Sequence, residues 1–290
     1  MSKIEDTGAL QREKQQAAAW DRLTGLRQHL YGAATWQMLA VADLQPGDQV
    51  LDIAAGTGDQ SRQAARLVGP QGSVLATDIS KEMLKVAARR AEQEGLSNIT
   101  TRAMNAEQLD LPENRYDAVI SRFGLMLIPN LQQALAEIRR VLKPGGRLAA
   151  LVWSKPERNP LLTLGGAILA KWRTTEEGEE QQFDLFSLAD AALFASMLTE
   201  AGFPEVQMQV ITLTFHFPSF EVLTAWWGSP WRQALAKLDS ESGQRLLKEA
   251  RQAVRQFEEP QGIIAPAEVV LGVGTKEERA PLKQEKEMDL

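Results

Sequence analysis

Two aspartates and a glycine turn stand where a nucleoside could bind. Asp52 lies within the apolar run 50–53, and the turn Gly56–Gly58 follows that run closely. Glycines here remove Cβ atoms that would keep a ligand from the backbone, and a helix starting at Asp59 would present free N–H groups. Asp78 ends the next apolar run, where a carboxylate can accept hydrogen bonds from both ribose hydroxyls. The spacing predicts a site for an adenosine-like ligand.

The same turn lacks the third glycine of a dinucleotide-binding fingerprint. Ser61 stands three residues after Gly58, where NAD-binding proteins place that glycine. The sequence therefore predicts a ligand without a pyrophosphate. A strand followed by Gly-x-Gly is by itself also compatible with an ordinary strand-to-helix turn, so the assignment depends on its surroundings.

Alternating strand and helix patterns surround the turn and predict an α/β fold. Apolar runs predict strands at 50–53, 73–78, 99–104, 116–121 and 147–153, and helical periodicity follows at 60–68, 81–94 and 131–142. Ser80 and Asn130 are typical N-caps, and Gly95 is a typical C-terminal stop. Ligands of such sheets bind at the carboxyl ends of the strands, where the turn and Asp78 would lie.

The second half of the chain reads differently and predicts a cap. Residues 155–202 are mostly helical and read as an insertion over the carboxyl edge of the sheet, while 206–217 and 268–275 read as strands separated by a helical stretch, 219–257. We expect four segments: an N-terminal helical lid with a disordered start at 1–45, the cofactor-binding core at 46–154, cap helices plus the last two strands at 155–276, and a disordered charged tail at 277–290.

The composition of the chain argues against several classes of partner and site. Its 290 residues include 32 basic and 38 acidic ones, and the net charge of -6 argues against a protein that grips many nucleic-acid phosphates. The absence of cysteine excludes disulfides, thiolate nucleophiles and cysteine-based metal sites. The acidic run 176–180 lacks ligand spacing, so we expect a solvated loop and no metal site. No stretch is apolar enough for a membrane span or a signal peptide, so we expect a cytoplasmic monomer or homodimer.

Taken together, the separated motifs resemble class I S-adenosylmethionine-dependent methyltransferases, in the branch of the ubiquinone and menaquinone biosynthesis enzymes. Ala54–Asp59 is similar to that branch's A-G-G-T-G-D turn, Asp78 to its ribose acid, 105–107 to its adenine-side loop and 143–146 to its K-P-G-G turn. The resemblance covers residues 20–154 well and the remainder loosely. It implies a Rossmann-like, seven-stranded, mostly parallel sheet in the order 3-2-1-4-5-7-6 with a helical lid. The implied cofactor is S-adenosyl-L-methionine, with S-adenosyl-L-homocysteine as product.

The resemblance also implies which residues hold the cofactor. The turn backbone and the carboxylate of Asp52 would face the methionine part, Asn105 and Ala106 would contact adenine, and Ile79 and Met83 would lie against the base. The implied cofactor-binding set is Asp52, Ala54, Gly56, Thr57, Gly58, Asp78, Ile79, Met83, Asn105 and Ala106, and the chemistry of its guanidinium group adds Arg122 to the candidates.

The chain departs from the quinone methyltransferases where the acceptor would bind. Those enzymes read S-F-G-L-R-N where this chain reads R-F-G-L-M-L, so Arg122 replaces their serine and Met126 their arginine. A quinone acceptor is therefore in doubt. Arg122 could clamp an anionic acceptor or the cofactor carboxylate, or form a surface salt bridge. Phe123, Met126 and Trp226 are further candidates for acceptor contact.

Few residues could act as a base or line an acceptor pocket. His29, the one catalytic candidate, and His216 are the only histidines, and each is also simply explained as an exposed or structural residue. Trp226, Trp227 and Trp231 either line an apolar acceptor pocket or pack the cap onto the sheet.

Three functions fit parts of the pattern. A short-chain NAD-dependent oxidoreductase needs a Tyr-x-x-x-Lys pair, but Tyr31 and Tyr116 are followed four residues later by Thr35 and Ile120, which excludes this class. A methyltransferase-like protein that binds the cofactor without transferring methyl, as an accessory subunit or a catalyst of another reaction, stays open. The favoured function is methyl transfer by in-line displacement to a small apolar or aromatic metabolite, at carbon, oxygen or nitrogen.

Overall fold

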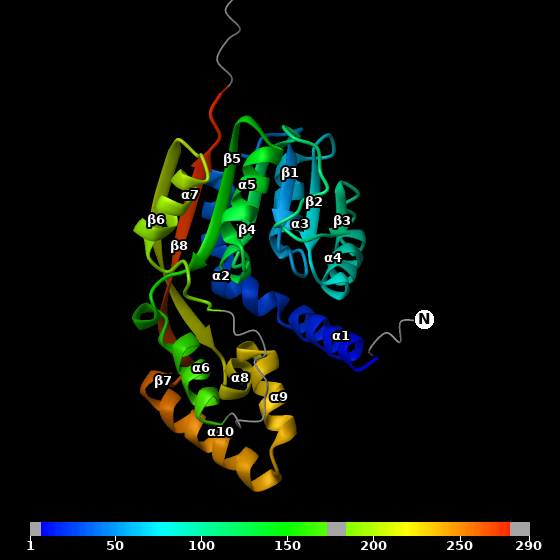
Figure 1. Cartoon of the computed structure of the whole chain (residues 1–290). Helices are drawn as coiled ribbons and strands as arrows, with labels where there is room; N and C mark the ends of the chain where they lie inside the picture. The colour runs from blue at the N-terminus through cyan, green and yellow to red at the C-terminus, as the bar shows by residue number, and fades with distance from the viewer. Residues whose placement is uncertain (1–6, 173–183, 279–290) are drawn as a thin grey trace, which may run out of the picture.

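The computed structural model describes residues 7–172 and 184–278, and its strands form one sheet (Figure 1). The strands are β1 (Gln49–Ile53), β2 (Ser73–Asp78), β3 (Ile99–Ala103), β4 (Tyr116–Arg122), β5 (Leu142–Trp153), β6 (Glu205–Phe217), β7 (Glu258–Glu259) and β8 (Gly262–Thr275). Their order is β3-β2-β1-β4-β5-β8-β6, with β7 paired to β8. The first five are parallel, and β8 is antiparallel to β5 and β6. The predicted order is confirmed, but the predicted count of seven is wrong because the two-residue strand β7 adds an eighth.

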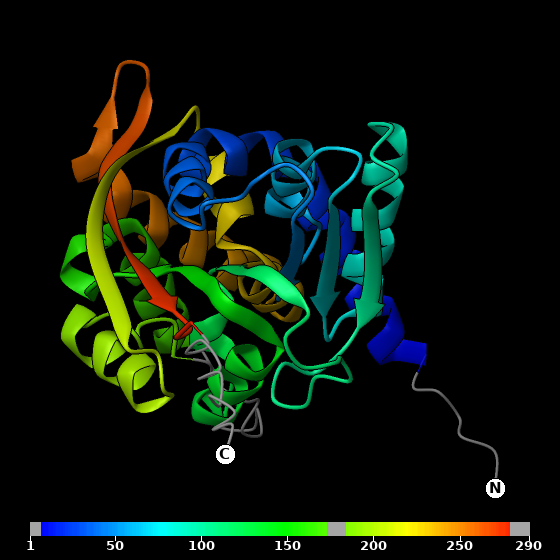
Figure 2. The same ribbon diagram turned by 90° about the horizontal axis from the view of Figure 1, so that it is seen from above.

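Helices cover both faces of the sheet. α2 (Thr24–Val41), α3 (Asp59–Val68) and α4 (Lys81–Gln93) lie on one face, and α5 (Leu131–Val141) and α7 (Ala191–Glu200) on the other (Figure 2). α1 (Thr7–Arg22) packs against α4, and short 3-10 turns occupy Leu125–Leu127, Pro156–Arg158 and Arg255–Phe257. Ser80 and Asn130 accept hydrogen bonds from the backbone N–H groups of Met83 and Gln133, at 3.3 and 3.2 Å, which confirms both predicted N-caps.

The core lies between these layers. Every residue from Leu148 to Val152 in β5 is fully buried, because helices cover the strand on both sides. α7 and the loop after it fit closely onto β8: a Cβ on Gly272 would lie 2.5 Å from the ring of Phe194 in α7, and a Cβ on Gly274 would lie 2.8 Å from that of Phe203 in the loop. Both glycines therefore allow aromatic rings to press directly on the strand.

β6 and β8 continue past β5 as a two-stranded ribbon. β5 pairs with β8 from Val269 to Thr275, whereas β6 pairs with it from Ile263 onward. The sequence predicted this strand from residue 268, but it begins at Gly262; Pro266, which reads as a strand breaker, lies where β8 has run past β5. Because β8 runs antiparallel to β5, the ribbon extends from the carboxyl edge of the parallel strands.

The ribbon leads to a group of helices that forms a cap at one end of the sheet (Figure 1). These helices are α6 (Pro160–Trp172), α8 (Phe220–Trp227), α9 (Ser229–Lys237) and α10 (Ser240–Val254). Trp227 and Trp231 stack with ring centroids 4.4 Å apart, and their indole N–H groups donate to the carbonyl oxygens of Leu161 and Gly165. These two tryptophans thus join α8 and α9 to α6 inside the cap.

Some predicted segments lie outside the described residues, namely the first six residues, the acidic run 176–180 and the tail after residue 278. Within the two described ranges, no helix combines the length and the apolar character that a membrane span requires.

Candidate functional site

The glycine turn joins β1 to α3 at the carboxyl edge of the sheet. Gly56 and Gly58 both have positive φ angles, 57° and 74°. A Cβ on Gly56 would meet no atom within 4 Å, so the backbone there borders space that a ligand can occupy. A Cβ on Gly58 would instead lie 2.9 Å from the Cβ of Ala87 on α4. The prediction that both glycines clear space for a ligand is wrong for Gly58, which allows the turn to approach α4.

The turn after β4 fits against the start of the glycine turn. Ala54 has a φ of 53° and Phe123 a φ of 58°, a backbone region that residues with a Cβ seldom adopt. The methyl group of Ala54 has room because Gly124 faces it: a Cβ on Gly124 would lie 2.5 Å from that methyl. The two loops therefore form one close-packed edge.

Asp78 is held beside the glycine turn by backbone donors. One carboxylate oxygen accepts a hydrogen bond from the N–H of Gly56 at 2.9 Å, and the other accepts one from the N–H of Ser80 at 2.8 Å. Burial raises the pKa of this carboxyl, and the backbone donors oppose the rise. Each carboxylate oxygen keeps a further lone pair, so the group fits the two hydroxyls of a ribose.

The residues predicted for the adenine side surround Asp78. The N–H of Met104 donates to the carbonyl oxygen of Asp78 at 3.0 Å, which places the following residues, 105 and 106, beside the end of β2. Ile79 is 76% exposed, an open position for an apolar side chain directly after Asp78, whereas Met83 is buried against α1. Their contacts with adenine stay predictions.

Asp52 lies beneath the turn. Its side chain is fully buried and accepts hydrogen bonds from Gln60, at 3.0 Å, and from the hydroxyl of Ser61. Burial raises the pKa of Asp52 to about 7, against the effect of the hydrogen bonds from Ser61 and Gln60. Ser61, at the position of the missing third glycine, thus ties α3 to β1. The contact of Asp52 with the methionine part of the cofactor stays a prediction.

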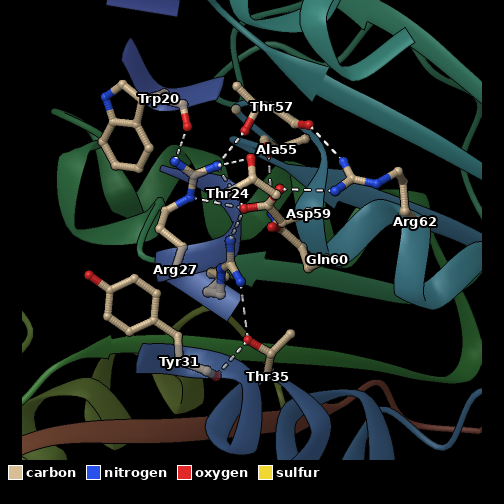
Figure 3. Close-up of polar contacts among 12 residues, drawn as sticks. Trp20, Thr24, Arg27, Tyr31, Thr35, Ala55, Thr57, Asp59, Gln60 and Arg62 are labelled. Atoms are coloured by element: carbon tan, nitrogen blue, oxygen red, sulfur yellow. Dashed lines mark hydrogen bonds and ion pairs between the residues drawn. The ribbon is translucent and has the colours of Figure 1, made fainter. Parts of the chain in front are cut away.

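Three arginines surround Asp59, the first residue of α3, and Figure 3 labels two of them, Arg27 and Arg62. It accepts hydrogen bonds from Arg27 at 2.9 Å, from Arg122 at 3.3 Å and from Arg62 at 3.2 Å. Burial alone would raise the pKa of Asp59, but the charges of Arg27, Arg122 and Arg62 outweigh burial and lower it. The side chain of Arg122 is 8% exposed, so the salt-bridge interpretation was wrong in placing it at the surface.

Arg27 is a site residue that the sequence analysis missed. It extends from α2, is 3% exposed, and donates to the hydroxyl of Thr57 at 2.9 Å and to the carbonyl oxygen of Trp20. These bonds fasten the N-terminal helices to the glycine turn. The available signal was a charged residue on the apolar face of the helix, in line with Leu30 and Tyr31.

Aromatic rings gather beyond Arg122. Tyr31 lies edge-on to Phe123 with centroids 5.1 Å apart, and Phe123 stacks on Trp153 at 4.4 Å. Trp226 donates its indole N–H to the Tyr31 hydroxyl, and its ring lies 5.6 Å from that of Phe215. The rings connect α2, the turn after β4, β5, β6 and α8, and they bring together two of the residues predicted for the acceptor, Phe123 and Trp226.

The other candidates lie around this cluster. His29 is exposed and edge-on to His216, with ring centroids 6.3 Å apart. At 100° per residue, His29 points to the face of α2 opposite Arg27 and Tyr31, and its catalytic role stays a prediction. Met126 is buried in the 3-10 turn after β4. Among the described residues, no group of three or more His, Cys, Asp or Glu side chains is placed to hold a metal ion.

Comparisons with known proteins agree with this geometry. The ubiE/COQ5 methyltransferase family matches residues 21–168. A ubiquinone/menaquinone biosynthesis C-methyltransferase UbiE from Pseudomonas aeruginosa (strain LESB58) is 36% identical over 189 residues, which cover 60% of this chain and 72% of that protein. A crystal structure of a putative methyltransferase from Bacillus halodurans matches with a TM-score of 0.59 at 23% identity, over 84% of this chain and 99% of that one. The chain therefore belongs to the ubiE/COQ5 methyltransferase family and is an S-adenosylmethionine-dependent methyltransferase.

Proposed function

We propose that the enzyme methylates a small apolar or aromatic metabolite held against its aromatic cluster. This cluster comprises Tyr31, Phe123, Trp153, Phe215, Phe217 and Trp226. Phe123 and Trp226 are the two members that are only partly buried, and their rings can give a flat apolar molecule both burial and ring contacts. The cluster is the observation that supports the proposal, because Phe123 directly follows Arg122, which bonds to Asp59 in the cofactor turn.

The protein's part in the reaction would be to bind and align. Asp78 would hold the ribose, and Gly56 would let the backbone approach the cofactor. When bound, S-adenosylmethionine supplies a methyl group activated by the positive sulfur. The main remaining task of the protein is therefore to align the acceptor with that methyl group. Burial raises the pKa of Tyr31, so its hydroxyl keeps its proton at neutral pH and can donate it in a hydrogen bond to an acceptor.

The proposal extends beyond quinone precursors. The relative from Pseudomonas aeruginosa is named for ubiquinone and menaquinone biosynthesis. In this chain, the positions of the quinone enzymes' serine and arginine hold Arg122 and Met126. Arg122 donates hydrogen bonds to Asp59 and to the hydroxyl of Thr35, so its charge is paired with an acid of the glycine turn and is not left free for the acceptor. We therefore propose that aromatic compounds other than quinone precursors also serve as acceptors, with methylation at carbon, oxygen or nitrogen.

Two measurements test the proposal in sequence. Calorimetry with S-adenosylhomocysteine should give saturable heat at submicromolar to submillimolar ligand, and its absence would contradict the cofactor site. Methyl-labelled S-adenosylmethionine is then offered with phenols, quinols and aromatic amines, and with aliphatic amines as a control. Label on the aromatic panel supports the proposal. Label that stays on the donor despite cofactor binding would favour a protein that binds without transferring methyl.

A further inference from the structure

A crevice lies between the N-terminal helices and the cap. Trp20, Leu23 and Arg27 line one wall, and Trp226, Gly228 and Arg232 line the other. The first wall belongs to α1, α2 and their junction, and the second to the end of α8 and the start of α9. The crevice is therefore built by two regions that are distant in sequence.

The charges that line this crevice are positive. Arg27 and Arg232 are the charged residues among its lining side chains. Arg22 lies close enough to add to them: burial lowers the pKa of Arg232, and the charge of Arg22 lowers it further. The chain as a whole has a net charge of -6, so this concentration of arginines is local.

Two acids beside these arginines, Asp21 and Asp59, also pair with arginines outside the crevice. Asp21, next to Arg22, pairs with Arg89 and Arg90 on α4. Asp59 pairs with Arg27 but shares its single charge with two further arginines. In the part of the chain that the structure describes, the crevice thus keeps a positive charge that a bound anion would neutralise.

The crevice also offers flat apolar surfaces that lead inward. Trp20 is 44% exposed, and its ring centroid lies 4.9 Å from the guanidinium of Arg27 (Figure 3). Trp226 on the other wall donates to the hydroxyl of Tyr31 and so continues into the aromatic cluster. Arg27 reaches Thr57 of the cofactor turn at 2.9 Å. A molecule with one end in the crevice could extend from there toward the reaction site.

We infer that the crevice binds the anionic group, a carboxylate or a phosphate, of an acceptor whose flat apolar body lies along Trp226 toward the aromatic cluster. Guanidinium groups suit this role because their planar array of donors matches the oxygens of such anions. The inference rests on the proposed function, since the occupant is the acceptor. The carboxylate of the cofactor has the same chemistry and is the other possible source of the anion.

The test uses two probes of equal shape and different charge on the full chain. Naphthoate and uncharged naphthamide are titrated calorimetrically, with and without saturating S-adenosylhomocysteine. A carboxylate bound by arginine should give naphthoate an advantage of about tenfold in affinity. Arg232→Gln should abolish this advantage and leave the affinities for naphthamide and S-adenosylhomocysteine unchanged.

Arg245→Gln provides the matched control. Arg232 and Arg245 each donate to a serine three residues earlier, Ser229 at 3.0 Å and Ser242 at 3.1 Å, but Arg245 is on α10 and does not line the crevice. This variant should keep the preference for naphthoate.

Three results would overturn the inference: no binding of naphthoate, equal affinity for both probes, or a preference that survives Arg232→Gln. A loss of S-adenosylhomocysteine affinity in Arg232→Gln would assign the crevice to the cofactor carboxylate and overturn it as well. Failure of the unchanged protein to bind S-adenosylhomocysteine would count against the proposed function, and the titrations without that ligand would still decide the role of the crevice.

Discussion

The contacts that stabilise the cofactor core differ in kind from those that stabilise the cap. In the core, backbone donors hold the carboxylate beside the glycine turn: the N–H groups of Gly56 and Ser80 fix Asp78. In the cap, side chains fit against helices far away in sequence, as Trp227 and Trp231 do when they donate to carbonyl groups 66 residues earlier. The core is thus specified by short stretches of sequence, and the cap by the fit of distant surfaces.

This difference matches the different requirements of cofactor binding and acceptor binding. The cofactor side needs a fixed backbone shape, which a few glycines and carboxylates provide. The proposed acceptor side lies where α2, the sheet edge and α8 meet, at Arg27, Tyr31 and Trp226. Changes in the cap can therefore alter the acceptor without disturbing the cofactor cradle.

The largest expected effect is the loss of the ribose acid. Asp78→Ala removes both acceptors for the ribose hydroxyls, and charge-assisted hydrogen bonds of this kind are worth roughly 1.5–3 kcal/mol each. We expect the affinity for S-adenosylhomocysteine, measured by calorimetry, to fall by at least about a hundredfold. Asp110→Ala, which alters an exposed acid between β3 and β4, is the control and should bind normally. Unchanged affinity in Asp78→Ala would remove the basis for calling this edge the cofactor site.

A pair of glycine variants separates folding from binding within the core. Gly58→Ala would place a methyl 2.9 Å from Ala87 at a φ of 74°, so its free energy of unfolding should fall by about 2–4 kcal/mol. Gly56→Ala meets no atom within 4 Å and should cost only about 1 kcal/mol of stability, from its positive φ. Its methyl would enter the ligand space, so the affinity for S-adenosylhomocysteine should fall about tenfold. Equal stability losses in urea unfolding would contradict this assignment.

The sequence predicted the core well because its patterns are local. The strand at 73–78 and the caps at Ser80 and Asn130 each depend on a few adjacent residues, and all three are confirmed. The role of Gly58 was beyond sequence reasoning, because the atom that demands a glycine belongs to Ala87 on another helix. A glycine that admits a ligand and one that admits a neighbouring helix have the same appearance in a sequence.

The acceptor side could be predicted only in part, for a related reason. Arg122 and Phe123 were recognised because they align with a family segment that follows a predicted strand, but Arg27 carries no motif and becomes visible only when α2 lies on the turn. The three tryptophans at 226, 227 and 231 were treated as one group. They divide between the cluster and the cap interior because neighbouring positions on a helix face different directions.

A pH experiment tests whether the acid beneath the turn acts on stability. The folded pKa of Asp52, about 7, lies above its unfolded value, so the folded protein binds the proton more tightly. This contribution is fully present below about pH 4 and is lost as the pH rises through about 7. Asp52→Asn keeps the hydrogen-bonding shape without the charge. Its stability relative to the unchanged protein should therefore improve by about 4 kcal/mol between about pH 4 and about pH 8. Urea unfolding at each pH measures this difference, with Asp110→Asn as the control. Parallel pH profiles for the unchanged protein and Asp52→Asn would contradict the prediction, because they would mean that Asp52 has the same pKa in the folded and unfolded states.

Two adjacent glycines of α6 offer the sharpest test of how the cap is held. A Cβ on Gly165 would lie 2.5 Å from the indole nitrogen of Trp227, whereas one on Gly166 would meet no atom within 4 Å. Gly165→Ala should therefore lower the free energy of unfolding by about 1–3 kcal/mol, because the ring has to move. Gly166→Ala should raise it by roughly 0.5–1 kcal/mol, because alanine favours the helix. Both variants should bind S-adenosylhomocysteine normally, since the cofactor cradle is built from other elements. If Gly165→Ala proved as stable as Gly166→Ala, the fit of Trp227 would not be what holds the cap; if it lost cofactor affinity, cap and core would be coupled more tightly than their contacts indicate.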